Sequence, residues 1–130
     1  MAAEASGRGE PEGFMIRNRN TVEHYKWGHS DGWRLLDRAD LSVIQERMPP
    51  GSAEVKHLHR RARQLFYVLE GTIEMEIRGE VLTLGAGDAL EVAPGEAHRV
   101  RNTSASDASL IVISAPSTAG DREENEPLKP

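Results

Sequence analysis

The middle of the chain alternates apolar and polar residues with a period of two. Ile73, Met75 and Ile77 alternate with charged residues, and a turn at Gly79 leads into a second apolar run at 81–84. A period of two places the apolar side chains on one face of an extended strand, so the two runs predict an antiparallel hairpin with one buried face. Further strands are predicted at 42–48, 64–69, 89–93, 98–102 and 110–114. Short strands separated by Gly-rich turns predict an all-β sandwich or barrel.

The strand signals define one domain with distinct ends. A chain of 130 residues suits a single domain with a real core. Residues 1–13 are rich in Ala, Gly and Glu and are predicted to be disordered, because they carry little to bury. Residues 14–39 are expected to add N-terminal strands or a cover, and residues 40–116 to form the barrel. Residues 117–130 are expected to form a charged tail.

The composition of the chain argues against several classes of binding partner. A net charge of −5 and an isoelectric point near 5.5 argue against nucleic-acid binding, which needs a basic face. The absence of cysteine excludes disulfides, thiolate metal ligands and cysteine nucleophiles, and it fits a reducing compartment. No apolar run approaches the length of a membrane span, and the first residues do not resemble a signal peptide. We therefore expect a cytoplasmic protein with no membrane or nucleic-acid partner.

Three histidines carry the clearest functional signal. His57 and His59 are separated by one residue, so their side chains project to the same side of an extended segment. His98 lies far downstream, just after a Pro-Gly pair. Imidazole is the commonest metal ligand in proteins, and three converging imidazoles suit a first-row divalent ion. Strand parity allows Gln64 to share their face if the chain reverses direction between 60 and 63.

The spacing of these residues resembles the two sequence motifs of the cupin family. The first motif matches Gly51, His57, Leu58, His59, Gln64 and Gly71, with Gln64 in place of the usual glutamate. The second motif matches Gly87, Ala93, Pro94, Gly95, His98 and Asn102, with Ala93 in place of a proline. The resemblance covers about residues 40–115. It implies a double-stranded β-helix, the jelly-roll-like cupin barrel, that holds a divalent metal ion through His57, His59, Gln64 and His98.

Gln64 sets the charge of the expected site. A glutamate would cancel one unit of the charge of the ion, whereas the neutral amide leaves the full double positive charge and makes the ion a stronger Lewis acid. Three nitrogen donors and one oxygen donor are compatible with Zn, Ni, Fe, Co or Mn. Within the family, a glutamine at this position is similar to the cupins of pectin and alginate breakdown that ketonise unsaturated uronates.

These features favour metal-dependent isomerisation or enolisation of a small sugar-like or keto acid. Two alternatives stay open: an Fe-dependent dioxygenase that uses the same histidines, and a non-catalytic cupin that binds a small molecule or a metal. Arg47 is the candidate catalytic residue. If the strand at 42–48 points it inward, its guanidinium could clamp a substrate carboxylate; the alternative is an exposed strand arginine. A bound water or a nearby glutamate could also move protons.

Two further segments predict contacts outside the metal site. The strand at 64–69 is apolar on both faces, so its outward face needs a cover, either the N-terminal strands or a second subunit. A homodimer is the simplest cover. Trp27 and Trp33 flank a polar segment that could form a lid over the barrel mouth or an N-terminal cover with aromatic anchors.

Overall fold

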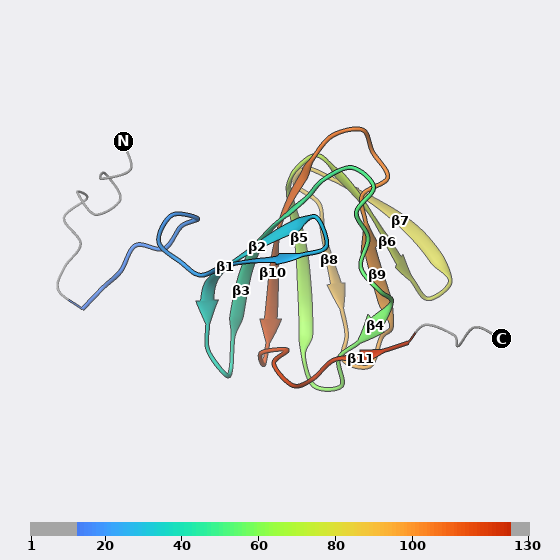
Figure 1. The fold of residues 1–130 in the computed structure, drawn as a ribbon. Coiled ribbons are helices and arrows are strands. Elements are labelled where there is room, and N and C mark those ends of the chain that lie inside the picture. Colours follow the sequence, from blue (N-terminus) through green and yellow to red (C-terminus); the bar gives the residue numbers. More distant parts are fainter. Residues whose placement is uncertain (1–12, 126–130) are drawn as a thin grey trace.

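The chain folds into short strands joined by turns (Figure 1). The computed structural model describes residues 13–125. The strands are β1 (His24–Trp27), β2 (Ser30–Asp37), β3 (Ser42–Met48), β4 (His57–Leu58), β5 (Arg63–Glu70), β6 (Thr72–Ile77), β7 (Glu80–Gly85), β8 (Ala89–Val92), β9 (His98–Arg101), β10 (Ala108–Ala115) and β11 (Glu123–Glu124). Within residues 13–125, no helix is long and apolar enough to cross a membrane. The segment predicted to be disordered, 1–13, falls almost entirely outside the described residues.

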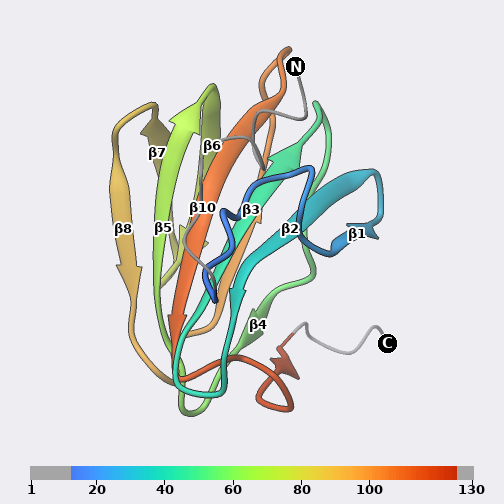
Figure 2. The ribbon, with the colours of Figure 1, turned by 90° about the vertical axis from the view of Figure 1, so that its left-hand side faces the viewer.

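The strands form two antiparallel sheets that face each other. The first sheet has the order β1-β2-β3-β10-β5-β8, and the second has the order β11-β4-β9-β6-β7. Figure 2 looks onto the first sheet, where β10 lies between β3 and β5 although these strands are far apart in the sequence. Such crossing between two facing sheets is a double-stranded β-helix, which confirms the predicted fold class.

Alternating side chains build the core between the sheets. On β6 the apolar residues Ile73, Met75 and Ile77 are buried and face the interior, as the alternation predicts. On β5 every second residue is buried, including Phe66 and Val68. This apolar cluster fills most of the space between the sheets. The start of β5 and the starts of β4 and β9 contribute buried polar side chains instead, and this end of the barrel is the candidate site.

A single glycine allows the tight turn between β5 and β6. Gly71 has φ of 78°, a conformation that side-chain-bearing residues rarely adopt. A Cβ at this position would also lie 2.5 Å from the carbonyl oxygen of Asp107. Steric exclusion of a Cβ therefore explains why the first motif requires glycine at this position.

The two ends of the described chain differ from each other. In the N-terminal part, β1 and β2 form a hairpin that extends the first sheet, with Gly28 at φ 58° in its two-residue turn. The C-terminal part is the segment where a charged tail is expected, at 117–130. Its β11 pairs with β4 in the second sheet, and only 126–130 lie outside the described residues. Charge composition missed this because the pairing uses backbone groups.

Candidate metal centre

The predicted ligands come from both sheets. His57 begins β4 and pairs in register with His98, which begins β9. His59 follows β4 directly, and Gln64 lies near the start of β5 in the facing sheet. All four side chains are buried. The fold therefore gathers residues from three separate strands and one loop at the same end of the barrel.

The imidazole rings of the three histidines surround one point. A ligand nitrogen from each of His57, His59 and His98 lies within 4.8 Å of the other two. Their ring centres are 4.5 to 6.0 Å apart. Phe66 packs edge-on against His98 with ring centres 5.7 Å apart, which restricts rotation of that imidazole. This arrangement can hold one metal ion.

Each imidazole is oriented by a backbone carbonyl. The Nδ1 atoms donate hydrogen bonds of 2.8, 2.7 and 3.0 Å from His57 to Val55, from His59 to Asp121 and from His98 to Glu96. A proton on Nδ1 leaves Nε2 with the lone pair that a metal requires. The Nε2 of His98 is buried and has no hydrogen-bond partner within the described chain. The ring orientations therefore match those of metal-ligating histidines.

Burial also sets the charge state of the three imidazoles. Desolvation lowers the pKa of His57 to about 3 and lowers the pKa values of His59 and His98. A neutral imidazole can donate its lone pair to a cation, and neutral rings do not repel one another. The three neutral imidazoles can therefore bind a cation.

Gln64 supplies a candidate oxygen donor. Its Nε2 donates a 3.1 Å hydrogen bond to Oγ of Ser114 on β10. Its Oε1 is buried and has no hydrogen-bond partner among residues 13–125. A buried acceptor without a hydrogen-bond donor destabilises the folded state. One cation bound by the Oε1 of Gln64 and the Nε2 of His98 would satisfy both atoms. The donor set thus fits a divalent metal ion.

Changing Gln64 to glutamate should tighten the binding of the metal. The variant adds a negative charge beside a doubly charged ion, so it should release metal to a chelator more slowly at neutral pH. The release rate in excess EDTA, followed by elemental analysis of the retained protein, measures the effect. Gln45→Glu provides the matched control, because Gln45 does not line the histidine cavity. Faster release from the Gln64 variant would show that this residue is not a ligand.

A C-terminal strap, defined here as residues 117–125, locks His59 in place. The carbonyl of Asp121 accepts the Nδ1 hydrogen bond of His59. The carboxylate of Asp121 accepts three backbone hydrogen bonds of 2.9 to 3.0 Å, from Arg60, Arg61 and Ala62. Glu123 adds a bidentate contact to Arg60, at 2.7 and 3.0 Å. The strap therefore fixes both the turn after His59 and the orientation of its imidazole.

Asp121→Ala should lower the metal affinity of the site, although Asp121 is not one of the predicted ligands. The substitution leaves the buried N–H of Ala62 without its acceptor, at a cost of about 1–3 kcal/mol, and it loosens the carbonyl that orients His59. Loss of such an outer partner lowers metal affinity by about 10- to 100-fold. Metal titration and thermal unfolding measure the two effects. The exposed Asp40→Ala serves as the control, and an unchanged metal affinity in the Asp121 variant would contradict the role of the strap.

Two glutamates share the cavity of the histidines. Glu46 on β3 and Glu54 before β4 line the same 180 Å³ cavity as His57, His59 and Gln64. Burial and the neighbouring Glu54 raise the pKa of Glu46 to about 8, and burial raises the pKa of Glu54 to about 7. The backbone N–H of Val100 donates to Glu54 at 3.2 Å. Carboxyls with near-neutral pKa values can both accept and donate protons.

Tyr25 forms another part of the cavity wall. Its ring packs against β2 at Gly32, where a Cβ would lie 2.3 Å from the ring. The guanidinium of Arg34 covers the ring at 4.4 Å. Burial, followed by the charge of Glu46, raises the pKa of Tyr25 to about 12. The phenol is therefore protonated at neutral pH and can donate a hydrogen bond into the cavity.

Arg47 does not face the histidines, in contrast to the inward orientation that a catalytic role would need. Its guanidinium contacts Asp31 at 2.6 and 2.8 Å and Asp107 at 3.1 Å, and it does not line the histidine cavity. The apolar residues Ile44 and Met48 take the inward positions of β3. Arg47 has the opposite parity and therefore points outward.

The alternation of side chains along β3 also identifies Glu46, a residue that the sequence prediction did not place in the site. Ile44 and Met48 are separated by four positions, and on a strand this puts the residue between them, Glu46, on the same inward face. Following the apolar positions of this strand indicates an inward-facing carboxyl in the barrel. Glu54 and Arg122 offer no comparable signal, because both lie in irregular segments.

Comparison with known proteins agrees with this geometry. A family model described as "Cupin domain" matches residues 44–114. An oxalate-binding protein from Thermotoga maritima is 28% identical over 67 residues, which are 52% of this chain and 55% of that protein. The chain spans about half the length of the curated relatives it matches.

Solved structures match over more of the chain. The protein TT1209 from Thermus thermophilus is 28% identical with a TM-score of 0.68, covering 78% of this chain and 96% of that one. KdgF from Halomonas sp. is 21% identical with a TM-score of 0.72, covering 80% and 96%; at this identity the likeness shows the fold alone. With the family model matching more than half of its length, this chain belongs to the cupin domain family.

Proposed function

We propose that this protein is a metal-dependent enzyme that isomerises or enolises a small sugar-like or keto acid. The observation that carries the proposal is the half-buried carboxyl pair, Glu46 and Glu54, in the same cavity as His57 and His59, two of the three neutral histidines. Isomerisation and enolisation need proton transfer beside an oxygen-rich carbon, and a carboxyl with a raised pKa performs that transfer at neutral pH.

The residues divide the chemistry between them. A divalent ion would be held by four residues, which are His57, His59, His98 and, through its Oε1, Gln64. The bound ion would supply Lewis acidity toward the substrate oxygens, which the neutral Gln64 leaves undiminished. Any of Zn, Ni, Fe, Co or Mn fits this donor set.

Glu46 and Glu54 move the proton. The carboxylate of the pair takes a proton from the carbon beside the substrate carbonyl, or from an enol oxygen, while the electron pair of the broken bond stays on the substrate. The resulting carboxylic acid returns a proton to the neighbouring atom of the enol system, so that atoms and charge balance over the cycle. Mutual repulsion keeps the pair singly protonated near neutrality.

Arg122 takes the role of carboxylate anchor that sequence reasoning gave to Arg47. It lines the histidine cavity together with both glutamates, and no other arginine or lysine among the described residues does so. Its closest acidic contact, Glu124, is 4.0 Å away. This separation leaves the guanidinium able to bind a substrate carboxylate in bidentate fashion.

Metal content and isotope exchange test the proposal. Protein purified without a metal-affinity tag is analysed for its elements and then incubated in D2O with sugar acids, unsaturated uronates and 2-keto acids. NMR should detect deuterium at the carbon beside the carbonyl, with no oxygen consumed. Iron in the native protein with substrate-dependent oxygen uptake would instead identify a dioxygenase. The absence of exchange in every metal-loaded form would identify a binding protein.

We also propose that the outward face of β5 joins two copies of the chain. Leu65, Tyr67 and Leu69 are 37%, 39% and 40% exposed on this face, and β8 and β10 lie beside β5 in the sheet without covering it. Burying this apolar surface against a second copy would remove it from water.

Light scattering coupled to size-exclusion chromatography should give twice the 14.3 kDa chain mass. Tyr67→Lys should return the protein to a monomer, because the ammonium would be buried in the contact. Val81→Lys on β7 is the control, since Val81 is exposed on the opposite sheet. A wild-type protein that elutes only as a monomer would remove the proposal.

A further inference from the structure

The histidine cavity lies beside a larger space. The inner chamber measures 180 Å³, and the space beside it, called here the vestibule, measures 740 Å³, about four times as much. Four residues line both spaces, and they are Tyr25, Glu46, Glu54 and Arg122. These residues form the boundary between the two compartments. The two spaces are therefore adjacent, with side chains of the same four residues between them.

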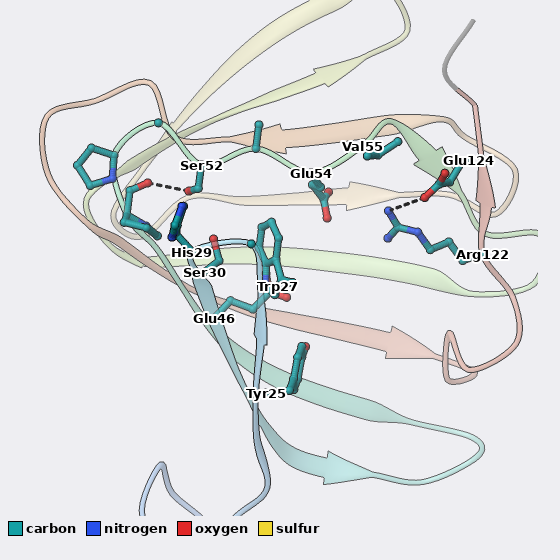
Figure 3. Close-up of a pocket in the computed structure, with 15 residues that line it drawn as sticks. Tyr25, Trp27, His29, Ser30, Glu46, Ser52, Glu54, Val55, Arg122 and Glu124 are labelled. Atoms are coloured by element: carbon teal, nitrogen blue, oxygen red, sulfur yellow. Dashed lines mark hydrogen bonds and ion pairs between the residues drawn. The ribbon is translucent and has the colours of Figure 1, made fainter. Parts of the chain in front are cut away.

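Most residues in the walls of the vestibule have no role in the proposed reaction. The β1–β2 hairpin supplies Trp27 and Ser30, and the loop before β4 supplies Pro49, Pro50 and Ser52 among other residues. Figure 3 shows these parts arranged around one space, with Trp27 near Glu46 and Glu54 in this view. The segment around Trp27 is therefore part of a ligand-sized concavity.

Two polar atoms in this wall are left without partners. The Nε1 of Trp27 and the Oγ of Ser30 are buried and make no hydrogen bond within the described part of the chain. Ser30 has no exposed surface. Buried donors without acceptors are uncommon in folded proteins. They indicate a ligand that brings oxygen acceptors to the β1–β2 hairpin, just as Gln64 Oε1 and His98 Nε2 indicate a cation in the chamber.

The mixture of groups in the vestibule indicates what kind of ring it accepts. Trp27 provides a broad apolar surface with a polar edge. Ser30, Ser52 and His29 can exchange hydrogen bonds with hydroxyl groups. Three glutamates line the vestibule, and Arg122 is the one arginine or lysine there, so carboxylate charges outnumber permanent positive charges even with the Glu46–Glu54 pair singly protonated. This excess of carboxyls favours hydroxyl donors and disfavours a second negative charge on the ligand.

We propose that the natural ligand is a sugar acid with two rings or units. Its acidic unit occupies the chamber, with the carboxylate on Arg122, and a neutral, hydroxyl-rich sugar ring fills the vestibule against Trp27 and Ser30. The acidic unit is the substrate of the proposed reaction, so the inference rests on that function for its chemistry. The vestibule extends the recognition from a small acid to a disaccharide acid.

Matched ligands test the inference by binding alone. Isothermal titration of the wild-type holoprotein compares gluconate, which has only the acidic unit, with lactobionate, which adds a neutral galactose ring. Lactobionate should bind at least about 10-fold more tightly, equivalent to about 1.4 kcal/mol. Lactose, which lacks the carboxylate, should bind far more weakly than either. Equal affinities for gluconate and lactobionate would overturn the proposal, and this comparison needs no variant.

A second pair of ligands tests the charge of the outer ring. Digalacturonate adds to galacturonate a ring that carries its own carboxylate. We expect no gain in affinity from this ring, because it would meet the acidic wall of the vestibule. A gain as large as that between gluconate and lactobionate would show that the outer ring need not be neutral.

Fluorescence locates the outer ring. The chain has two tryptophans, and Trp33 is 7% exposed and does not line the vestibule, so Trp33→Phe leaves Trp27 as the sole reporter. Lactobionate should change its emission, and gluconate should not. Trp27→Ala should reduce the affinity for lactobionate to that for gluconate and leave gluconate binding unchanged. Equal weakening of both ligands would place the ring elsewhere.

These measurements separate the inference from the proposed function. All of them are made at equilibrium and require no turnover. Absence of deuterium exchange would overturn the isomerase proposal while leaving the preference for lactobionate intact. Exchange without that preference would support the isomerase and overturn the two-unit ligand.

Discussion

Replacing His59 with alanine should abolish stoichiometric metal binding. The substitution removes one of three imidazoles that converge within 4.8 Å, and the remaining two nitrogens with one amide oxygen cannot hold an ion through purification and dialysis. It also leaves the carbonyl of Asp121 without its donor, so the strap should loosen. Elemental analysis of untagged protein should find about one metal per chain in the wild type and close to none in the variant.

His24→Ala provides the control for this experiment. His24 contacts Asp31 at 2.7 Å on the outer part of the first sheet and lies outside the histidine cluster, so its loss should leave the metal content unchanged. Thermal unfolding of both variants shows whether the fold survives. If the His59 variant folds and retains a full equivalent of metal, the site is elsewhere.

Glu46→Gln should give the largest loss of activity without loss of metal. The amide keeps the size of the side chain but cannot carry the proton, and removal of a general acid–base group lowers rates by about 100- to 10,000-fold. Deuterium exchange into a substrate of the proposed class measures the rate, and elemental analysis confirms that metal is retained. Glu80→Gln, at an exposed position on β7, is the matched control.

The pH dependence distinguishes a catalytic role for Glu46 from a structural one. Burial raises the pKa of this carboxyl to about 8. Between the ordinary pKa of a glutamate and pH 8, the folded protein therefore keeps a proton that the unfolded chain has released. The contribution of Glu46 to stability therefore decreases as pH rises from about 4.5 to 8. In the glutamine variant this decrease should disappear, together with the matching limb of the pH–rate profile. A variant with a wild-type rate and an unchanged profile would exclude Glu46 from proton transfer.

The strands could be predicted because their signal is local. The apolar positions of β6 recur every second residue, and the same spacing on β5 places Phe66 in the interior and Tyr67 on the outside. The closeness of His57 and His59 follows from the same rule. Strand periodicity is a property of the extended backbone, so it is visible in the sequence before any contact between strands is known.

Of the cavity-lining groups that the sequence prediction did not place, only Glu46 could be found by the same rule. Glu46 faces inward because β3 places Ile44 and Met48 on its inner face, and the prediction for Arg47 assumed the opposite parity. The contacts of Asp121 with His59 and of Arg122 with the cavity depend on a C-terminal strap whose charged composition indicates a free tail. The strap contacts join segments that are distant in the sequence, so no local pattern predicts them.

The sequence by itself determined an all-β chain and the pair of histidines that one extended segment must present together. Only the tertiary structure decided that His98 and Gln64 meet this pair, which carboxyls share their cavity, and that a vestibule opens beside it. The reason is that a backbone repeat constrains neighbouring residues directly, whereas the contents of a cavity depend on how two sheets and their loops pack across one another.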